Sequence, residues 1–568
     1  MLQVHNLHTY FYSHDQCTKA VKGVSFNLEK GETLGIVGES GSGKSVTALS
    51  ILKLITSPPG KIEEGEIIIQ DNGQNVNLLT VPEQEMHQYR GRCVAMIFQE
   101  PMTSLNPVMR CGDQVLEAIM THNNISKQEA KEKVLMLFDE VQLPDPSALY
   151  DKYPHEISGG QKQRVMIAMA LSCNPDILIA DEPTTALDVT VQKTIIDLLK
   201  RLIAARGMSL IFISHDLGVI AQICDQVLVM YKGQVIENGS CQEILKSPKE
   251  SYTKGLLACR PPLDYKTRRL PTVQDYLNKD LTPFTEEKIS HKEIQARLDH
   301  LVEQKPLVRV RNLKSYYTKK KNFFGKTTDW FKAVEDVSFD IYPGETLGLV
   351  GESGCGKSTL GRTIIRLKEA ISGSVNYRDI DVLHCDKNKL RSLRKKMQII
   401  FQDPYSSLNP RMQIGNAIME PMEVHKLHGN RSNRRSKAIE LLNKVALGEE
   451  HFHRYPHQFS GGQRQRICIA RALAVEPEFI ICDEAVSALD VSVQASVINL
   501  LKDLQAEFNL TYLFISHDLS VIQYFSDRIM VMNQGQIVET GSAEEIFKHS
   551  KNEYTRQLIK AIPKLNFN

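Results

Sequence analysis

One glycine-rich phrase occurs twice in this chain, and this repeat constrains the fold more than any other feature. Residues 38–45 read GESGSGKS and residues 351–358 read GESGCGKS, so seven of eight letters agree at positions 313 apart. The agreement extends further, because YPHEISGGQKQR (153–164) returns as YPHQFSGGQRQR (455–466) and IFISHDLGVI (211–220) as LFISHDLSVI (513–522). Solenoid repeats have units of about 20–50 residues. A longer repeat indicates two copies of a whole domain.

The spacing between the shared phrases is nearly the same in both copies. A Glu follows the Ser of SGGQ by 24 residues, and a His follows that Glu by 33. The copies differ earlier, since 55 residues separate Lys44 from Gln99 but only 45 separate Lys357 from Gln402. The additional residues lie around 70–80 (QDNGQNVNLLT), a polar stretch that predicts an enlarged surface hairpin.

The length of 568 residues is too great for one ordinary domain. We expect a first domain over 1–262, a linker over 263–306 and a second domain over 307–568. Prolines and charged residues in the linker predict an ordered start followed by a looser or helical segment. The second copy also has an insert, TKKKNFFGKTTDWF (318–331). We expect a twisted hairpin packed on its own domain there, with contact to lipid headgroups as the alternative.

Composition excludes several classes of protein. The 69 basic and 67 acidic side chains provide no general attraction to nucleic acid or anionic lipid. No run reaches the roughly 18 apolar residues of a membrane span, and the N-terminal residues lack a signal-peptide layout. We therefore expect a cytosolic chain that meets a membrane only through a partner. The 11 cysteines form no C-x-x-C pair, which argues against zinc ribbons and secreted disulfide frameworks.

Short apolar runs in each copy alternate with helical patterns. The runs of the first copy are TLGIV (33–37), ILIA (177–180) and LIFIS (210–214), and those of the second include FIIC (479–482) and YLFIS (512–516). Strands that alternate with helices are typical of α/β domains with a largely parallel sheet. We therefore predict an α/β fold in both copies.

The glycine loop of each copy has the composition of a phosphate-binding loop. Glycines let the backbone curl so that its N–H groups point at an anion, and the helix that follows adds its positive end. The lysine is expected to reach the β- and γ-phosphates of ATP, and the serine after it to take a place on Mg²⁺. The predicted loop residues are Gly38, Ser40, Gly41, Gly43, Lys44 and Ser45, and Gly351, Ser353, Gly354, Gly356, Lys357 and Ser358.

An Asp-Glu pair ends one predicted strand in each copy. The pairs are Asp181–Glu182 and Asp483–Glu484. We expect the Asp to hold Mg²⁺ through water or a hydroxyl and the Glu to orient or deprotonate an attacking water. Such a pair is a weak signal by itself, but it lies at a matched distance from two phosphate loops.

The phrase SGGQ, shortly before each Asp-Glu pair, resembles the signature of the ATP-binding cassette (ABC) family. The resemblance covers nearly all of the chain except the linker. It implies that each copy is a P-loop NTPase domain with a RecA-like parallel-sheet core, an antiparallel β subdomain and an α-helical signature subdomain. The helical subdomains are expected at about 100–160 and 403–462.

The same resemblance implies roles for single polar and aromatic residues. One glutamine in each copy resembles the Q-loop residue that links Mg²⁺ and water to an attached membrane subunit, and one histidine resembles the switch that contacts the γ-phosphate. One aspartate resembles the D-loop residue that crosses between domains, and one aromatic matches the ring that stacks on adenine. In that order these residues are Gln99 and Gln402, His215 and His517, Asp188 and Asp490, and Phe11 and Tyr317.

In this family SGGQ faces the phosphate loop of the other domain, so the two domains are expected to pair head to tail with ATP between them. A helix N-terminus with exposed N–H groups suits a γ-phosphate. One composite site would combine Lys44, Glu182 and His215 with Ser460, Gly461, Gly462 and Gln463. The other would combine Lys357, Glu484 and His517 with Ser158, Gly159, Gly160 and Gln161.

Other phrases resemble one subfamily, the importers of dipeptides, oligopeptides, nickel and glutathione. They are MIFQEPMTSLNP, IIFQDPYSSLNPRM, YTKGLL (252–257) and YTRQLI (554–559), while GSGKSVTALSIL, MALSCNP and DEAVSALDVS look closest to fused ATPase subunits of glutathione importers. The resemblance implies two transmembrane permease subunits, indirectly a periplasmic or extracellular solute-binding protein, no nucleic acid, and a peripheral place on the cytoplasmic face of the bacterial inner membrane. Some relatives carry a cysteine-rich tail, but that region has only Cys259, so we predict no iron–sulfur cluster.

Two alternatives stay open at this point. A soluble tandem-cassette ATPase that acts on ribosomes or DNA would be expected to carry DEPTNHLD with a long basic linker, or zinc cysteines, and the sequence has neither. A non-hydrolysing scaffold is disfavoured by the two intact glutamates, although Pro183–Thr184 becomes Ala485–Val486 in the second copy. Cys355 replaces Ser42 of the first loop. We expect a tolerated small residue there, with a thiol that alkylates and blocks ATP as the alternative.

Overall fold

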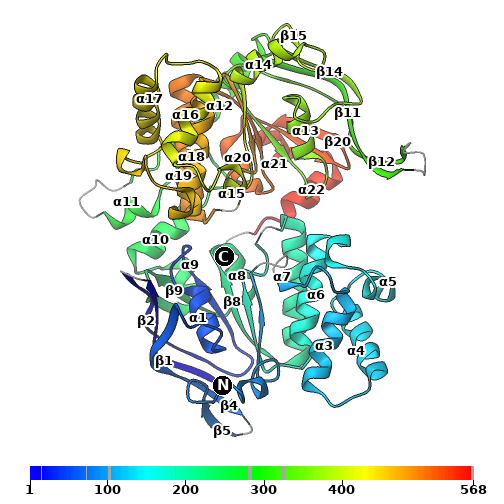
Figure 1. Ribbon diagram of the computed structural model, residues 1–568, viewed down its shortest axis with the longest axis vertical. Helices are drawn as coiled ribbons and strands as arrows, with labels where there is room; N and C mark the ends of the chain where they lie inside the picture. The colour runs from blue at the N-terminus through cyan, green and yellow to red at the C-terminus, as the bar shows by residue number, and fades with distance from the viewer. Residues whose placement is uncertain are drawn as a thin grey trace.

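The structure is a computed structural model that describes residues 1–13, 16–71, 73–99, 104–185, 187–278, 284–321, 327–487 and 489–563. Its two halves have the same architecture and lie against each other, the N-terminal half at the bottom of Figure 1 and the C-terminal half at the top. Each half contains one six-stranded and one four-stranded sheet. The predicted duplication of an α/β domain is confirmed.

The six-stranded sheet of the first half has the order β10-β9-β3-β8-β7-β6 and is parallel except at its edge, where β10 runs antiparallel to β9. Its strands are β3 (Thr33–Val37), β6 (Val94–Ile97), β7 (Ile177–Asp181), β8 (Ser209–Ser214), β9 (Gln226–Tyr231) and β10 (Gln234–Ser240). The four-stranded antiparallel sheet consists of β1 (Leu2–Ser13), β2 (Gln16–Leu28), β4 (Gly60–Asp71) and β5 (Gln74–Asn77). The β4–β5 pair is the enlarged hairpin predicted around 70–80, with residue 72 outside the described residues.

The second half repeats both sheets. Its six-stranded sheet has the order β16-β17-β18-β13-β19-β20, formed by β13 (Thr346–Val350), β16 (Met397–Ile400), β17 (Phe479–Asp483), β18 (Thr511–Ile515), β19 (Arg528–Asn533) and β20 (Gln536–Ser542). Its antiparallel sheet consists of β11 (Val308–Lys321), β12 (Thr327–Ile341), β14 (Ser372–Tyr377) and β15 (Ile380–Asp381). Every residue of β3, β7, β13 and β17 is buried, as expected for strands covered on both faces.

A group of helices stands beside the sheets in each half (Figure 1), and each group overlaps the stretch predicted for a signature subdomain but extends past its predicted end. In the first half they are α3 (Cys111–His122), α4 (Lys127–Glu140), α5 (Pro146–Tyr150) and α6 (Gly159–Leu171), with a short 3₁₀ turn η2 (Pro154–Glu156), while another, η1 (Met86–Gln88), comes earlier, before β6. In the second half they are α15 (Pro404–Ser407), α16 (Ile414–Val424), α17 (Arg431–Lys444) and α18 (Gly461–Leu473), with η3 (Glu449–His451) and η4 (Pro456–Gln458). Residues 100–103 lie outside the described part.

The remaining helices cover the sheets or follow them. They are α1 (Lys44–Ile51), α7 (Val189–Arg206), α8 (Leu217–Ile223), α9 (Cys241–Lys246), α10 (Ser251–Ala258), α11 (Val273–Leu277) and α12 (His291–Val302), then α13 (Lys357–Ile364), α14 (Lys387–Lys396), α19 (Val491–Phe508), α20 (Leu519–Phe525), α21 (Ala543–His549) and α22 (Glu553–Lys560). No helix in the described ranges is long and apolar enough to cross a membrane.

The stretch predicted as a linker packs on the second half. Leu270 is fully buried, and its N–H and C=O bond to the side-chain amide of Asn499 at 2.9 and 2.8 Å. Further along, Arg297 on α12 forms an ion pair with Asp527 at 2.6 Å. The packed residues around Leu270 agree with the predicted ordered start, and α12 agrees with the predicted helical segment. Residues 279–283 lie outside the described residues.

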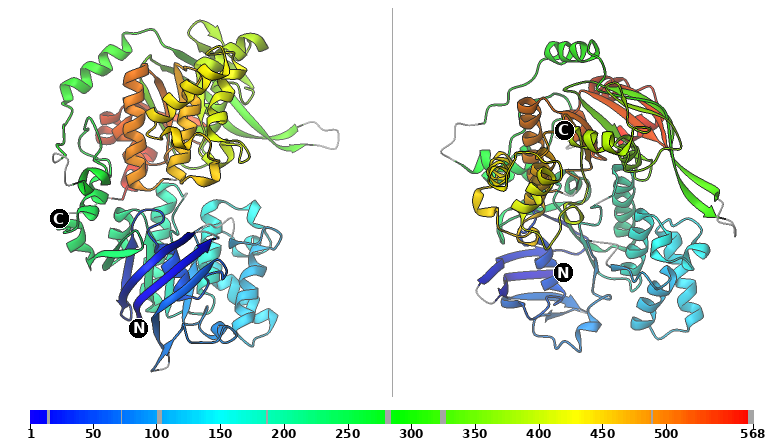
Figure 2. Two further views of the ribbon diagram at one scale, coloured as in Figure 1. Left: turned by 60° about the vertical axis from the view of Figure 1, so that its left-hand side comes forward. Right: turned by 45° about the horizontal axis from the view of Figure 1, so that its top comes forward.

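The insert at 318–331 forms a hairpin, as predicted, but the expectation that it packs on its own domain is wrong. Its strands β11 and β12 extend away from the body of the second half (Figures 1 and 2). The reason is the end of the sheet, because β14 pairs with β11 only as far as Lys314, and beyond it β12 is the only strand of the described residues that pairs with β11. Trp330 and Phe331 are about half exposed there. Residues 322–326 lie outside the described part.

Candidate nucleotide-binding sites

Each glycine loop surrounds one buried lysine. Lys44 Nζ donates hydrogen bonds to the carbonyl oxygens of Gly38 and Glu39 at 2.7 and 2.9 Å. Lys357 Nζ makes the same two bonds, to Gly351 and Glu352, at the same distances. The loop therefore holds an ammonium group at its centre, where it can act as a point charge for a phosphate.

The loop backbone requires glycine just before the helix begins. Gly43 has φ 103° and Gly356 has φ 112°, in the left-handed region that favours glycine. A Cβ atom at these positions would lie 2.5 Å from Ala20 O and 1.9 Å from Ala333 O. Both glycines immediately precede the first turn of α1 and α13, whose free N–H groups and positive end attract anions.

A serine hydroxyl and a buried carboxylate meet at the end of each loop. Ser45 Oγ donates to Asp181 Oδ1 at 3.0 Å, and Ser358 Oγ donates to Asp483 Oδ1 at 2.6 Å. Burial raises the pKa of Asp181 to about 6 and also raises that of Asp483. Mg²⁺ prefers such oxygen ligands, and a buried carboxylate that is poorly neutralised by the protein fits a cation.

The glutamate that follows Asp181 is surrounded by hydrogen-bond donors. Glu182 Oε2 lies 2.8 Å from Thr185 Oγ1, 3.3 Å from Gln99 Nε2 and 3.2 Å from His215 Nδ1. Burial opposes ionisation, but the hydrogen bond and the charge of His215 outweigh it and lower the pKa of Glu182 to about 2. Burial likewise opposes protonation of His215, but Glu182 outweighs it and raises the pKa of the imidazole. Glu182 is therefore ionised at neutral pH.

The second half has the same arrangement with one donor fewer. Glu484 Oε2 lies 2.8 Å from Gln402 Nε2 and 3.3 Å from His517 Nδ1. Burial opposes its ionisation, and the hydrogen bond with His517 outweighs burial and lowers its pKa. Ser487 occupies the position of Thr185, yet its Oγ is buried and has no hydrogen-bond partner among the described residues. Glu182 and Glu484 also share a left-handed backbone, with φ 46° and 50°, a strain that concentrates at functional sites.

The two halves exchange contacts at the loops. Ser40 N–H donates to Asp490 Oδ2 at 2.9 Å, and Ser353 N–H donates to Asp188 Oδ2 at 3.0 Å. Beside these bonds, Ser492 Oγ donates to Glu39 and Thr190 Oγ1 donates to Glu352, the latter at 2.9 Å. Our sequence reasoning missed these glutamates and hydroxyls, although a Glu in each loop and a hydroxyl two residues after each D-loop Asp recur in both copies.

The signature residues lie at helix starts, as predicted. Ser158 Oγ accepts the N–H of Gln161 and Ser460 Oγ accepts that of Gln463, both at 3.3 Å, and each glutamine side chain accepts the serine N–H in return. These capping boxes begin α6 and α18 and keep the serine and glutamine side chains within their own turn. Gly159 and Gly461 are exposed at the helix ends. Their pairing with the opposite phosphate loops stays a prediction.

The two predicted adenine-stacking residues have different surroundings. Phe11 lies on β1 with Cε1 2.9 Å from the place that a Cβ on Gly60 would occupy. Tyr317 on β11 is 43% exposed, and Lys368 Nζ lies 3.8 Å from its ring centroid. Their stacking on adenine also stays a prediction.

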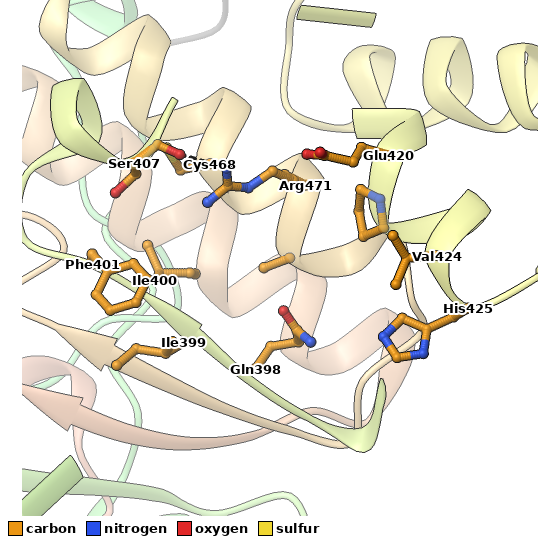
Figure 3. Close-up of a pocket in the computed structure, with 12 residues that line it drawn as sticks. Gln398, Ile399, Ile400, Phe401, Ser407, Glu420, Val424, His425, Cys468 and Arg471 are labelled. Atoms are coloured by element: carbon orange, nitrogen blue, oxygen red, sulfur yellow. Dashed lines mark hydrogen bonds between the residues drawn. The ribbon is translucent and has the colours of Figure 1, made fainter. Parts of the chain in front are cut away.

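A cavity of about 110 Å³ lies between the halves and is lined by residues of both, including the two histidines, Arg260 and Pro563. Another cavity, of about 310 Å³, lies in the second half beside β16, just before Gln402, and reaches α16 and α18. Figure 3 shows Arg471, Glu420 and His425 among its lining side chains.

Comparison with known proteins agrees with this geometry. Residues 21–185 and 334–487 match the ABC transporter family, and residues 236–282 and 538–568 match the C-terminal region of oligopeptide/dipeptide transporters. The glutathione import ATP-binding protein GsiA of Escherichia coli (strain K12) is 47% identical over 99% of this chain and 89% of that protein. The protein of the same name from Salmonella typhimurium (strain LT2) is 48% identical with the same coverage. A solved dimeric ATP-binding cassette bound to ADP and Pi is 30% identical over 42% of this chain and 98% of that one, with a TM-score of 0.38.

Proposed function

The chain belongs to the ABC transporter family and is an ATPase, and on this premise we propose that it powers a bacterial importer of peptides, glutathione included. One observation carries the proposal. The C-terminal region found in oligopeptide/dipeptide transporters follows the cassette in both halves, and both cassettes have a complete set of lysine, serine, aspartate, glutamate, glutamine and histidine. Relatives that import glutathione cover nearly the whole chain.

We propose that the glycine loops bind the phosphates of ATP through Lys44 and Lys357 and the N–H groups around them. Ser45 with Asp181, and Ser358 with Asp483, would hold Mg²⁺, which when bound neutralises phosphate charge. A carboxylate with a pKa of about 2 is a weak proton acceptor at neutral pH. Glu182 is therefore assigned to orient the attacking water through a hydrogen bond, and His215 to donate toward the terminal phosphate.

The contacts between the halves support coupling of the two sites. Asp188 and Asp490 each bond to the glycine loop of the opposite half. A change at one loop therefore reaches the D-loop and the catalytic glutamate of the other half, only six residues earlier in the chain. Opening and closing of this contact is the proposed mechanical output.

The proposed partners are two transmembrane permease subunits and, through them, a solute-binding protein. The cavity beside Gln402 is a candidate docking place for a permease, because it adjoins the residue that resembles the Q-loop (Figure 3). This assembly would hold the chain at the cytoplasmic face of the cell membrane. A soluble tandem-cassette ATPase acting on ribosomes or DNA is not supported, since the relatives and the C-terminal region belong to importers.

Co-expression tests the proposal directly. The chain is expressed alone and with a candidate pair of peptide-importer permease subunits, and membranes are separated from ribosomes and DNA. We expect co-sedimentation with membranes only when both permeases are present, and ATP hydrolysis in proteoliposomes that rises with the solute-binding protein loaded with glutathione or peptides. Constant association with ribosomes or DNA, and no response to the permeases, would reject the importer assignment.

A further inference from the structure

The tyrosine that opens each C-terminal YT phrase contacts the glycine loop of its own half. Tyr252 on α10 accepts a hydrogen bond from the backbone N–H of Glu39 at 3.0 Å. Tyr554 on α22 accepts one from the backbone N–H of Glu352, also at 3.0 Å. The two bonds are independent observations of one contact, which joins residues more than 200 positions apart in each half. Neither tyrosine belongs to the catalytic set described above.

Each tyrosine helix is itself fixed to the edge of the six-stranded sheet. Glu237 on β10 accepts the backbone N–H groups of Lys249 and Glu250 at 2.7 and 3.2 Å, just before α10. Glu539 on β20 accepts the N–H of Lys551 at 2.7 Å, just before α22. The phenol therefore reaches the loop from a rigid support, because its helix start cannot shift without breaking these charge-assisted bonds.

The loop peptides held by the tyrosines are the ones that meet the opposite half. In the first loop Glu39 N–H bonds to Tyr252, and the next N–H, of Ser40, bonds to Asp490. The Glu39 carboxylate also accepts the hydroxyl of Ser492. Two adjacent N–H groups of one turn are therefore bonded from different halves. Tyr252 of the same half accepts the first, and Asp490 of the opposite half accepts the second.

The second loop repeats this pattern. Glu352 N–H bonds to Tyr554, Ser353 N–H bonds to Asp188, and the Glu352 carboxylate accepts the hydroxyl of Thr190. Tyr252 is 2% exposed, and burial raises the pKa of both phenols, so they stay neutral over the physiological range. A neutral phenol beside a partly buried N–H is a constant acceptor, whose loss leaves that N–H without its protein partner.

We propose that Tyr252 and Tyr554 are positioning residues, which brace each glycine loop so that the opposite D-loop can dock on it. The C-terminal region of each half thereby sets how readily the ATP sites close. This inference rests on the proposed function, in which ATP closes the two halves on each other. It gives the YT phrases a role inside the ATPase itself.

Hydrogen exchange tests the brace without any need for turnover. In the full-length, nucleotide-free protein, Tyr252→Phe removes only the hydroxyl oxygen. We expect exchange of the Glu39 amide and its loop to speed up about tenfold, with the 351–358 loop unchanged, and the mirror result for Tyr554→Phe.

Tyr512→Phe is the matched control, because Tyr512 is also buried and its hydroxyl donates to Leu501 O at 3.1 Å in the core. Exchange at Glu39 that is the same in Tyr252→Phe and in wild type would overturn the proposal.

Double-mutant cycles test whether the brace acts through the D-loop. The half-saturating ATP concentration should rise about three- to tenfold in Tyr252→Phe, the factor that one net hydrogen bond contributes. The effects of Tyr252→Phe and Asp490→Ala should be strongly non-additive, as should those of Tyr554→Phe and Asp188→Ala. The crossed pairs, Tyr252 with Asp188 and Tyr554 with Asp490, should be additive within about twofold. If the substitutions acted only by lowering overall stability, the matched and the crossed pairs would show the same degree of additivity.

The results of these cycles distinguish failure of the tyrosine brace from failure of the proposed function. Additive effects in the matched pairs would overturn the brace even if the wild-type chain hydrolyses ATP and drives import. If the wild-type chain binds ATP but does not hydrolyse it, the proposed function fails, and the same cycles are then measured as ATP binding affinities. Non-additivity in those affinities would still support the brace, and additivity would still reject it.

Discussion

Asp188 of the first half accepts a hydrogen bond from the backbone N–H of Ser353 in the second half at 3.0 Å. The reciprocal bond, from Ser40 N–H to Asp490, is 2.9 Å long. The other carboxylate oxygen of Asp188 accepts the N–H of Val191 at 3.4 Å and so caps α7. One side chain thus fixes a helix start in its own half and a loop in the other. The two glycine loops are therefore linked through a pair of aspartates with near-twofold symmetry.

Replacing Asp188 by Ala should slow hydrolysis mainly at the site built on Lys357. In a Glu182→Gln background the remaining turnover comes from that site, so adding Asp188→Ala should reduce phosphate release about tenfold, because a charge-assisted hydrogen bond of about 1.5 kcal/mol or more is lost. In a Glu484→Gln background the same change should cost no more than about twofold. Asp490→Ala is the matched control and should show the reverse preference. Equal losses in both backgrounds would contradict contact across the interface.

Both glutamates that are proposed to orient water, Glu182 and Glu484, should be required for full turnover. Glu182→Gln and Glu484→Gln keep the size and most hydrogen bonds of the side chain but remove the charge that orients water, and a misplaced reactant costs about 10²-fold at one site. Each single variant should therefore lose at least about half of the steady-state phosphate release, and the double variant nearly all. A single variant with wild-type turnover would identify that site as degenerate. The hydrogen bond from Thr185 holds the carboxylate of Glu182 in place, whereas Ser487 makes no equivalent bond to Glu484 among the described residues.

Sequence patterns predicted the elements whose causes are local. Five consecutive buried residues, as in β3, are visible as an apolar run, and the loop that follows needs glycine at positions such as Gly43 for steric reasons. The motif residues around Glu182 followed from the same patterns and from the family resemblance. The contacts that the sequence did not predict join residues that are far apart in the chain. Tyr252 touches a loop 213 residues earlier, and neither phrase contains a local signal for that contact.

The linker shows a second limit of sequence reasoning. Its prolines and charged residues predicted an ordered start and then a looser or helical segment, but they did not indicate that Leu270 is buried against the second half. Asn499 satisfies both backbone groups of Leu270, a pairing across 229 residues that composition cannot reveal. Composition can indicate that a segment is ordered, but it cannot identify the distant amide that satisfies its backbone groups.

Stability of the nucleotide-free protein should depend on the charge of Asp181. Burial raises its pKa to about 6, so the folded chain binds this proton more tightly than the unfolded chain does, whose carboxyl titrates near 4. The contribution of Asp181 to stability therefore falls as the pH rises from about 4 to about 6 and stays low above that. Asp181→Asn should raise the melting temperature in EDTA by a few degrees at pH 7.5, for about 1–3 kcal/mol.

The difference between Asp181→Asn and wild type should shrink as the pH falls through 6, because the wild-type side chain then becomes neutral as well. Scanning calorimetry at several pH values between 5 and 8 measures this gap. Stabilisation by Mg²⁺ and ATP should be lost in the variant, which separates the role of Asp181 in folding from its role in binding. A lower melting temperature of the variant at pH 7.5 would show that the ionised carboxylate is stabilising and would contradict the raised pKa.

Cys355 should behave as a small buried residue that ATP protects. It is 7% exposed, burial raises the pKa of its thiol, and its Sγ lies 3.8 Å from Lys357 Nζ. A maleimide should therefore modify the exposed Cys17 first and Cys355 slowly, and Mg-ATP should slow the second reaction further. Cys355→Ser introduces the residue that the first loop has at this position. Turnover of this variant should stay within about twofold of wild type, and treatment with the maleimide should no longer lower it. Equal labelling of Cys355 with and without Mg-ATP would show that the thiol does not adjoin the nucleotide.

One charge distinguishes the metal-binding ends of the two loops. Arg362 on α13 places Nη2 3.7 Å from Asp483 Oδ2, whereas Leu49 occupies the same turn of α1, five residues after the loop lysine. A guanidinium beside a carboxylate that is proposed to hold Mg²⁺ opposes the cation, and because Arg362 is about half exposed the effect is partly screened by solvent. The second site should therefore need more Mg²⁺ than the first.

Arg362→Leu, tested in the Glu182→Gln background, where the remaining turnover comes from the second site, should lower the Mg²⁺ concentration for half-maximal phosphate release about two- to fivefold. Leu49→Arg in the Glu484→Gln background should raise it by a similar factor, so the reciprocal swap is its own control. If Arg362→Leu raises this Mg²⁺ concentration instead, the arginine acts by holding Asp483 in place, and the opposition between the two cations would be excluded.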